Sequence, residues 1–367
     1  MEEERYMKRA LELALRGRGH TAPNPVVGAV IVKDGRIIGE GWHEKFGGAH
    51  AERKALANCT ESPKGADLYV TLEPCCHWGK TPPCTDAIIE SGIRRVFVGS
   101  LDRNPLVRGK SRSILETQGI SVTEGILEKE CDMANEVFFH YIVHKTPFVY
   151  MKYAMTMDGK IACANGLSKW VTGGLAREKV AKDRSLAAGI MVGLGTVLAD
   201  DPLLTSRIPG GKNPKRIICD TRLTTPKNAR VVRTTDQAET IIATSNGDRE
   251  AWEPYEAAGC RIVWIPQKEG HVDLRKLMKW LGTEGIDSLI LEGGGQLNAS
   301  ALEAGIVHKV QVYIAPKIFG GTEAKTPVAG SGVFSPDQAW RLAAPQITRL
   351  GEDLLLESEV LLCSQGS

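Results

Sequence analysis

The chain is organised around residues 50–84, which begin with His50-Ala51-Glu52 and end with Pro74-Cys75-Cys76-His77-Trp78-Gly79-Lys80-Thr81-Pro82-Pro83-Cys84. One imidazole and two thiolates are the protein ligands of a catalytic zinc site, in which the fourth position stays open for water. The ion lowers the pKa of that water toward neutrality and so provides a hydroxide at physiological pH. We therefore predict one Zn²⁺ per chain, held by His50, Cys75 and Cys84.

Glu52 follows the first ligand by two residues. In zinc deaminases the nearby glutamate is not a ligand, because it moves protons between the attacking water, a ring nitrogen and the leaving amine. A His-x-Glu alone occurs often by chance, but it is specific when Pro-Cys and a further cysteine follow. The alternative is a structural zinc site, which would use four protein ligands and no glutamate. The eight residues between Cys75 and Cys84 differ from the commoner Cys-x-x-Cys spacing of nucleoside deaminases.

The composition is that of a soluble globular protein with two domains. The 367 residues are 42% hydrophobic and 25% charged, and this length exceeds one typical domain. A net charge of +2 gives no electrostatic reason to expect nucleic acid or a membrane as partner. Nine cysteines without regular spacing favour a reducing compartment. The acidic start has no apolar segment typical of a signal peptide, and no apolar run is long enough to span a bilayer, so we expect a cytoplasmic protein.

Hydrophobic periodicity and turn residues predict a three-layer α/β/α domain in the first part of the chain. Helices are expected at 4–16, 50–58, 84–91, 111–118 and 128–143, and strands at 26–32, 37–42, 66–72, 94–99 and 120–124. Lys145-Thr146-Pro147 ends the last helix. We place the domain boundary there, which gives domains 1–145 and 146–367.

Residues 50–84 closely resemble the deaminase half of the bifunctional riboflavin-biosynthesis deaminase–reductase family, which has a cytidine-deaminase-like fold. The family pattern is His-Ala-Glu followed by Glu-Pro-Cys-Ser-His-x-Gly-Lys/Arg-Thr-Pro-Pro-Cys. Here Cys76 replaces the serine, and Arg53-Lys54 replaces the more usual Val-His. We assign the metal to Cys75, which directly follows Pro74, and not to Cys76.

The resemblance implies a set of residues that bind the deaminase substrate. These are Asn24, His43, His77, Lys80, Asp102 and Asn104. Without the resemblance most of them would be ordinary turn residues. A lysine has a physical reason to be present, because the substrate carries a phosphate that a cation recognises. The family usually continues Val-Ala-Gly-Arg/Lys-Gly, whereas this chain has Val107-Arg108-Gly109-Lys110-Ser111.

In the second domain, glycine clusters follow two apolar strands. Gly193-Leu194-Gly195 follows the strand expected at 189–193, and Glu292-Gly293-Gly294-Gly295 follows the one at 287–291. Between a strand and a helix, such clusters let backbone N–H groups and the helix dipole meet a phosphate. The pattern is not the Gly-x-Gly-x-x-Gly dinucleotide fingerprint, and a glycine-rich turn without a ligand is the alternative.

The second domain is similar to the reductase half of the same family, which has a dihydrofolate-reductase-like α/β fold and reduces ribosyl to ribityl with NADPH. The similarity lies in Lys152-x-Ala154 with 158–162, in 193–207 and in 292–294. It implies cofactor contacts by Ala154, Trp170, Thr196, Asp200, Gly294, Gly295, Gln296, Leu297 and Asn298. It implies substrate contacts by Ser168, Arg184, Leu204, Arg207 and Glu292. Lys152 and Asp200 are the candidates to handle the proton, although an ion pair is the structural alternative. Arg222 is a candidate for the cofactor's 2′-phosphate.

We therefore predict a bifunctional enzyme of riboflavin biosynthesis whose partners are small phosphorylated pyrimidines. Zinc hydroxide would deaminate 2,5-diamino-6-ribosylamino-4(3H)-pyrimidinone 5′-phosphate, and NADPH would then reduce the ribosyl group, which gives 5-amino-6-ribitylamino-uracil 5′-phosphate. We expect a homo-oligomer. The alternative is a nucleoside or tRNA base deaminase with a non-catalytic C-terminal binding domain, and a third possibility is a zinc-stabilised binding module.

Overall fold

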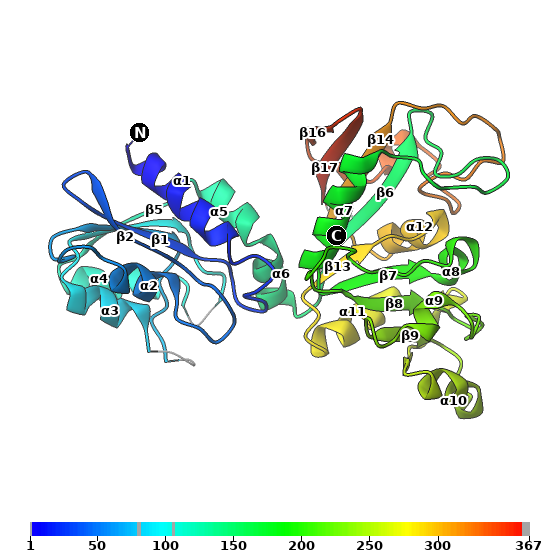
Figure 1. Ribbon diagram of the computed structural model, residues 1–367, viewed down its shortest axis with the longest axis horizontal. Helices are drawn as coiled ribbons and strands as arrows, with labels where there is room; N and C mark the ends of the chain where they lie inside the picture. Colours follow the sequence, from blue (N-terminus) through cyan, green and yellow to red (C-terminus); the bar gives the residue numbers. More distant parts are fainter. Residues whose placement is uncertain (1, 79–81, 105–106, 362–367) are drawn as a thin grey trace. The chain divides into compact units, whose positions relative to one another are not determined.

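The computed structural model describes residues 2–78, 82–104 and 107–361. The chain forms two compact units, Met1–Lys145 and Thr146–Ser367, and each is described by itself. Figure 1 shows the elements of both units along the chain.

A five-stranded sheet forms the centre of the first unit, in the order β2-β1-β3-β4-β5. Strand β1 pairs antiparallel with β2 and β3, whereas β3, β4 and β5 are parallel. The elements are α1 (Glu2–Leu15), β1 (Gly28–Lys33), β2 (Arg36–Trp42), α2 (Ala51–Ala57), β3 (Asp67–Leu72), α3 (Cys84–Ser91), β4 (Arg95–Ser100), α4 (Lys110–Thr117), β5 (Ser121–Glu124), α5 (Glu128–Ala134) and α6 (Glu136–His144).

Helices cover both faces of this sheet because side chains alternate along its strands. Along β1, Ala29 and Ile31 pack toward Ala55 of α2, whereas Val30 and Val32 pack toward Met7 of α1. The predicted three-layer α/β/α architecture is therefore confirmed.

One sequence expectation about this unit was wrong, because the helix predicted over 128–143 is two helices. The break falls at Asn135, whose backbone leaves the helical region with φ −116° and ψ 17°. The Asn135 side chain accepts a hydrogen bond from the Val26 N–H and donates one to the Val26 carbonyl, each 2.9 Å long. These bonds also explain why β1 begins at Gly28 and not at Val26: the backbone of Val26 is paired with a side chain instead of a strand.

The second unit contains a ten-stranded mixed sheet. Strands β10, β9, β8, β7, β13, β6 and β14 run parallel in that order, and β17 adds antiparallel to β14 and pairs with β15 and β16. The strands are β6 (Phe148–Thr156), β7 (Gly189–Gly193), β8 (Lys215–Cys219), β9 (Thr240–Thr244), β10 (Arg261–Trp264), β13 (Ser288–Leu291), β14 (Lys309–Ala315), β15 (Arg341–Leu342), β16 (Gln346–Leu350) and β17 (Asp353–Leu361), with a separate hairpin of β11 (Gln267–Lys268) and β12 (His271–Val272).

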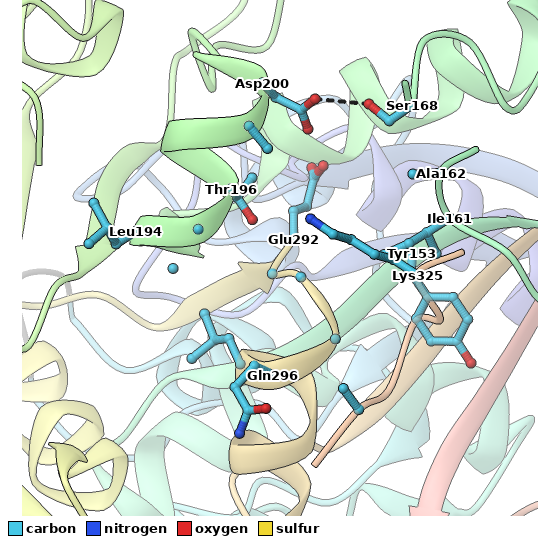
Figure 2. Close-up of a pocket in the computed structure, with 18 of the residues that line it drawn as sticks. Tyr153, Ile161, Ala162, Ser168, Leu194, Thr196, Asp200, Glu292, Gln296 and Lys325 are labelled. Atoms are coloured by element: carbon cyan, nitrogen blue, oxygen red, sulfur yellow. Dashed lines mark hydrogen bonds between the residues drawn. The ribbon is translucent and has the colours of Figure 1, made fainter. Parts of the chain in front are cut away.

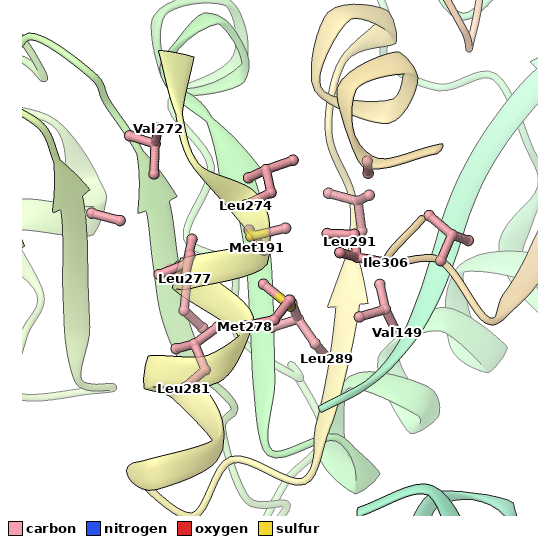
Figure 3. Close-up of a cluster of buried hydrophobic side chains, with 14 of the residues drawn as sticks. Val149, Met191, Val272, Leu274, Leu277, Met278, Leu281, Leu289, Leu291 and Ile306 are labelled. Atoms are coloured by element: carbon pink, nitrogen blue, oxygen red, sulfur yellow. The ribbon is translucent and has the colours of Figure 1, made fainter. Parts of the chain in front are cut away.

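Helices lie on both faces of this sheet as well. They are α7 (Gly174–Leu186), α8 (Leu194–Asp200), α9 (Arg230–Arg233), α10 (Arg249–Ala257), α11 (Leu274–Thr283), α12 (Gly295–Glu303) and the short 3-10 helix η1 (Pro336–Gln338). Figure 3 shows Leu277, Met278 and Leu281 of α11 packed against Met191 and Leu289 of the parallel strands. Parallel strands covered on both faces are typical of α/β proteins, so the predicted fold class is confirmed.

In the described part of the chain, no helix is long and apolar enough to cross a membrane.

Candidate active sites

The first candidate site brings together the three predicted metal ligands. His50 is the residue before α2, Cys75 follows β3, and Cys84 begins α3. Their ligand atoms lie within 4.8 Å of one another, and His50 Nδ1 is 3.4 Å from the Sγ atom of each cysteine. One imidazole and two thiols at such distances fit a zinc ion with one further position for water. Cys76 does not belong to this group.

The protein environment favours a thiolate at Cys75. The pKa of Cys75 is lowered, chiefly because Cys84 donates a hydrogen bond to its sulfur, and the His50 ring and the Cys84 backbone N–H add to the effect. The pKa of Cys84 is raised by its bond to Cys75 and by burial. The two sulfurs therefore hold one proton between them, and a bound cation would replace that proton.

Glu52 lies on the first turn of α2 and is almost fully buried, with 3% of its surface exposed. Burial raises the pKa of its carboxyl group, as does the charge of Cys75. The Glu52 carboxylate interacts with the Cys84 thiol, which places it beside the metal ligands. A carboxyl group with a raised pKa next to a metal-bound water suits proton transfer near neutral pH.

Asn24 and His43 form a hydrogen-bonded pair at the edge of this site. Asn24 Nδ2 lies 3.2 Å from His43 Nε2, and His43 Nδ1 lies 3.1 Å from the Ala49 carbonyl. If Nδ1–H donates to Ala49, Nε2 accepts from Asn24, and the ring is neutral. Burial lowers the pKa of His43, which agrees with the neutral form. The His43 ring meets His50 edge-on at 5.4 Å.

His77 and Asp102 interact electrostatically, and Asp102 also senses the charge of Cys75. The Nδ1 atom of His77 is buried and has no hydrogen-bond partner within the described ranges, so it is available to a ligand. Asp102 is 8% exposed, and burial raises its pKa to about 6. Its Oδ1 accepts the Asn104 N–H at 2.8 Å. The structure thus brings together five of the six predicted substrate residues, and Lys80 lies outside the described residues.

Arg53 and Lys54, the two residues of α2 that differ from the family pattern, contact different partners. Arg53 Nη2 donates to the carbonyl of Pro83 at 2.8 Å, directly before Cys84. Lys54 forms an ion pair with Glu44 at 3.1 Å. Arg53 therefore ties the helix that carries Glu52 to the start of the helix that carries Cys84.

The second candidate site is a cavity of about 1060 Å³ in the reductase-like unit. It lies where β6, β7, β8 and β13 end, at the carboxyl edge of the parallel strands, which is where open α/β sheets bind ligands. The predicted residues that line it are Lys152, Ala154, Ser168, Trp170, Arg184, Thr196, Asp200, Arg207, Arg222, Glu292, Gly294, Gly295, Gln296 and Leu297. A cavity of this size is large enough for a cofactor together with a substrate.

A buried ion cluster forms one wall of the cavity. Arg184 Nε and Nη2 bind the two carboxylate oxygens of Glu292 at 2.7 and 2.9 Å, and Lys152 Nζ lies 3.4 Å from Glu292. Burial by itself raises the pKa of Glu292, but the charges of Arg184 and Lys152 outweigh it and lower the pKa to about 2. Glu292 is therefore ionised and holds both cations at the cavity wall.

Asp200 does not join this ion cluster and is bonded to Ser168 instead. Its Oδ1 accepts a hydrogen bond from Ser168 Oγ at 2.8 Å, as Figure 2 shows, and its carbonyl accepts one from Lys169. The segment that carries Ser168 and Trp170 is thereby tied to the end of α8. In the same view, Thr196, Asp200 and Glu292 surround one space.

Two residues predicted to bind ligands do not line the cavity. Leu204 is 2% exposed and packs in the core with Val197 and Ile218. Asn298 is fully buried, and its Nδ2 donates to the Pro327 carbonyl at 2.8 Å. Contacts of these two residues with a ligand remain predictions.

Sequence reasoning missed several residues of the cavity wall. The wall also contains Tyr153, Ile161, Ala162, Thr221, His271, Lys325 and Thr326. Ile161 and Ala162 lie in the run 158–162 that resembles the reductase half of the family, whereas no local sequence pattern marks Lys325 and Thr326. They reach the site because Ile161 N donates to the Lys325 carbonyl at 2.9 Å, a contact between segments far apart in sequence.

These two sites define a class of protein, namely a zinc-type deaminase joined to a reductase. Family models agree: residues 1–100 match the cytidine and deoxycytidylate deaminase zinc-binding region, and residues 147–356 match the RibD C-terminal domain. The zinc-binding deaminase domain and the reductase domain imply zinc and a nicotinamide cofactor.

Whole-chain comparisons agree with the family models. The riboflavin biosynthesis protein RibD of Actinobacillus pleuropneumoniae is 51% identical over 97% of this chain and 95% of its own length. The RibD protein of Escherichia coli K12 is 38% identical over 97% of this chain and 99% of its own. A crystal structure from Thermotoga maritima, a diaminohydroxyphosphoribosylaminopyrimidine deaminase and 5-amino-6-(5-phosphoribosylamino)uracil reductase, has a TM-score of 0.85 and 39% identity, and covers 98% of this chain and 99% of its own. Acinetobacter baumannii RibD gives a TM-score of 0.85 at 33% identity with the same coverage.

The chain belongs to the RibD family of riboflavin biosynthesis proteins. It is a bifunctional deaminase and reductase that acts on a small molecule, as the two sites predict.

Proposed function

We propose that the first unit deaminates 2,5-diamino-6-ribosylamino-4(3H)-pyrimidinone 5′-phosphate at C2. The observation that carries this proposal is the buried Glu52 beside the three ligand atoms of His50, Cys75 and Cys84. These three residues would hold one Zn²⁺ per chain. When bound, the ion supplies an activated water for attack on C2.

The residues of this site divide the remaining work. Glu52 would take one proton from the attacking water and give it to the ring nitrogen, and would then carry the second proton, from the added hydroxyl group, to the leaving amine, which departs as ammonia. The pyrimidine and its sugar would be bound by the buried Nδ1 of His77 and by the side chains of Asn24, His43, Asp102 and Asn104. Lys80 is proposed to bind the phosphate.

Replacement of Glu52 by Gln tests the deaminase proposal. Glutamine has nearly the same shape but cannot accept and return the proton, so ammonia release should fall by about 100-fold or more. Zinc content, measured by atomic absorption, should stay at about one ion per chain because Glu52 is not a ligand. If the variant still releases ammonia at the wild-type rate, Glu52 is not the proton carrier.

We further propose that the second unit reduces the ribosyl group of the deaminated product to ribityl with NADPH. When bound, NADPH supplies the hydride. The glycines at 293–295 lead into α12, which begins at Gly295, so their backbone N–H groups suit a cofactor phosphate. The exposed Arg222 at the cavity wall suits the 2′-phosphate. A Cβ at Gly295 would come within 2.7 Å of the Thr326 carbonyl, so only glycine fits there.

The cations of the ion cluster suit the substrate and the proton in this reaction. Lys152 Nζ lies 3.4 Å from Glu292, and it is proposed to donate a proton to the adjacent nitrogen as the carbon of the ring-opened sugar receives the hydride. Asp200, bonded to Ser168, is proposed to bind the cofactor and take part in the same proton transfer. Arg207, whose side chain is exposed at the cavity, is proposed to bind the substrate phosphate, whereas Arg184 contacts substrate while paired with Glu292.

A coupled assay tests both halves together. The protein is incubated with the diaminopyrimidinone ribosylamino phosphate and NADPH, and ammonia and NADPH absorbance are followed in parallel. Ammonia release followed by loss of NADPH is the expected result. Ammonia release without NADPH consumption would leave a deaminase with a non-reducing second domain.

We also propose that the enzyme works as a homo-oligomer in the cytoplasm. Large exposed apolar side chains on the second unit, such as Phe334 at 93% and Ile318 at 78% exposure, support self-association. Light scattering during gel filtration measures the mass, and a mass of one chain at micromolar concentration would contradict the oligomer.

A further inference from the structure

Glu73 is a buried carboxylate that the reaction described above does not use. It follows β3 and precedes the metal ligand Cys75 by two residues, and only 4% of its surface is exposed. A buried carboxylate is stable only where hydrogen bonds or cations compensate the lost water. Among the described residues, the donors to the Glu73 carboxylate come from two neighbouring stretches, residues 102–104 and 107–111.

One oxygen of Glu73 joins these two stretches. Its Oε2 accepts the Asp102 N–H at 3.3 Å and the Gly109 N–H at 3.0 Å. Asp102 in turn accepts the Asn104 N–H through Oδ1 at 2.8 Å. The orientation of Asp102 and Asn104 therefore depends on where Glu73 holds the backbone.

The other oxygen holds the start of helix α4. Glu73 Oε1 accepts the Ser111 N–H at 3.2 Å and the Ser111 hydroxyl at 2.8 Å. The residue before the helix, Gly109, offers no side-chain cap, so Glu73 satisfies an N–H group that the helix itself leaves unpaired. A negative charge at a helix N-terminus is also favourable for the helix dipole.

We propose that Glu73 is a positioning residue of the deaminase, which fixes the segment bearing Asp102 and Asn104 relative to the metal ligand Cys75 and thereby sets the affinity for the pyrimidine substrate. This inference rests on the proposed deaminase function. It differs from a metal-binding role, because the Glu73 carboxylate binds Asp102, Gly109 and Ser111 and is not among the clustered ligand atoms.

The test is Glu73→Gln, measured for both activities of the full chain. The amide keeps the shape of the side chain, but its NH₂ group cannot accept the hydrogen bonds that a carboxylate oxygen accepted. The hydrogen bonds to one of the two Glu73 oxygens are therefore lost. We expect the deaminase KM for the diaminopyrimidinone ribosylamino phosphate to rise by about 10- to 100-fold, the effect of a displaced binding group. The deaminase kcat should stay within about threefold of the wild type, since only binding is impaired. Zinc content should be unchanged, and so should NADPH oxidation with the deaminated intermediate.

Two further variants keep the test decisive. Glu90→Gln changes an exposed glutamate of the same unit and should alter neither activity. Ser111→Ala removes one of the four donors and leaves the Glu73 charge in place, so KM should rise by about fivefold, the effect of one hydrogen bond. This variant carries the test if Glu73→Gln does not fold.

Three results would overturn the inference: an unchanged KM, a fall in kcat alone, or loss of zinc in step with loss of activity. Each requires that wild-type protein in the same assay releases ammonia. A zinc-loaded wild type that releases none would instead overturn the proposed deaminase function.

Discussion

The reductase site contains a buried ion cluster of three residues, Lys152, Arg184 and Glu292. Glu292 binds Arg184 with both oxygens and also contacts Lys152. Removal of one member of a buried ion pair is costly, because the remaining charge is left uncompensated. Glu292 therefore holds the two cations in place, and its action on the substrate together with them stays a prediction.

Substitution of Lys152 by Met should separate the two activities. Methionine fills a similar volume but carries no proton and no charge, so the reductase kcat should fall by about 100-fold or more. Ammonia release should stay at the wild-type rate, because Lys152 belongs to the other unit. NADPH oxidation with the deaminated intermediate measures the effect, and a wild-type reductase rate in Lys152→Met would contradict the proposed proton donor.

Asp102 gives a prediction of pH dependence. Burial raises its pKa to about 6, above the usual value of 3.8, so the folded protein favours the protonated form. The contribution of protonated Asp102 to the free energy of unfolding is fully present below about pH 4. It is lost as the pH rises through 6. Asp102→Asn cannot ionise and should be more stable than wild type above pH 6, by at most about 3 kcal/mol, with the difference vanishing near pH 4.

Thermal unfolding of the zinc-free proteins between pH 4 and pH 8 measures this difference. The amide oxygen of the variant can still accept the Asn104 N–H, so the comparison isolates the charge. If the difference in stability between the variant and the wild type does not change with pH, the pKa of Asp102 is not raised in the folded protein.

At the scale of secondary-structure elements, Asn135 decides where two helices separate. Its two hydrogen bonds to Val26 join residues 109 positions apart. Asn135→Ala removes both and leaves a buried N–H and carbonyl without partners, which should destabilise the first unit by about 2–4 kcal/mol. Asn58→Ala is the matched control, since Asn58 makes one exposed bond to Glu40 and should cost less than about 1 kcal/mol.

Urea unfolding followed by far-UV circular dichroism measures both variants. Equal losses in the two variants would mean that the buried pair contributes no more than a surface bond. NADPH oxidation by the second unit serves as the check that the rest of the chain is folded.

Helix α11 is the element that fills one face of the second unit's core. Leu277 is fully buried and packs there with Met191 and Leu289. Leu277→Ala should destabilise this unit by about 2–5 kcal/mol, through lost burial and the cavity that remains. NADPH oxidation should then be lost at a lower temperature than in the wild type, whereas ammonia release should keep its wild-type temperature profile. Parallel shifts of both profiles would show that the two units unfold together.

At the scale of the whole molecule, the two compact units carry chemically independent sites. The three metal-ligand atoms all belong to Met1–Lys145, and every residue of the large cavity belongs to Thr146–Ser367. Chelation of zinc should therefore abolish ammonia release, and binding of NADPH, measured by its fluorescence, should keep its wild-type Kd. Restored ammonia release on addition of Zn²⁺ completes the test, and loss of NADPH binding on chelation would contradict independent sites.

The sequence by itself determined the first unit's layers and pointed to the three residues whose ligand atoms cluster in the structure. These features follow from local sequence patterns, which need no knowledge of distant contacts. The patterns are the alternating side chains along β1, the helical spacing in α1, and the residue types at 50, 75 and 84. The glycines after β7 and β13 likewise marked the cavity's edge. Roles of individual site residues remain predictions until the variants above are measured.

Only the tertiary structure decided the features that depend on contacts between distant segments. Asn135 breaks a helix because Val26 offers it a backbone N–H and carbonyl, Lys325 reaches the cavity through its bond to Ile161, and Glu73 faces Ser111 across the first unit. Glu73 belongs to the Glu-Pro-Cys run, but neither that run nor the sequence around Asn135 and Lys325 shows which distant group each residue contacts. Their hydrogen-bonding groups are satisfied only once the chain has folded, and the cost of burying such groups unpaired selects these arrangements.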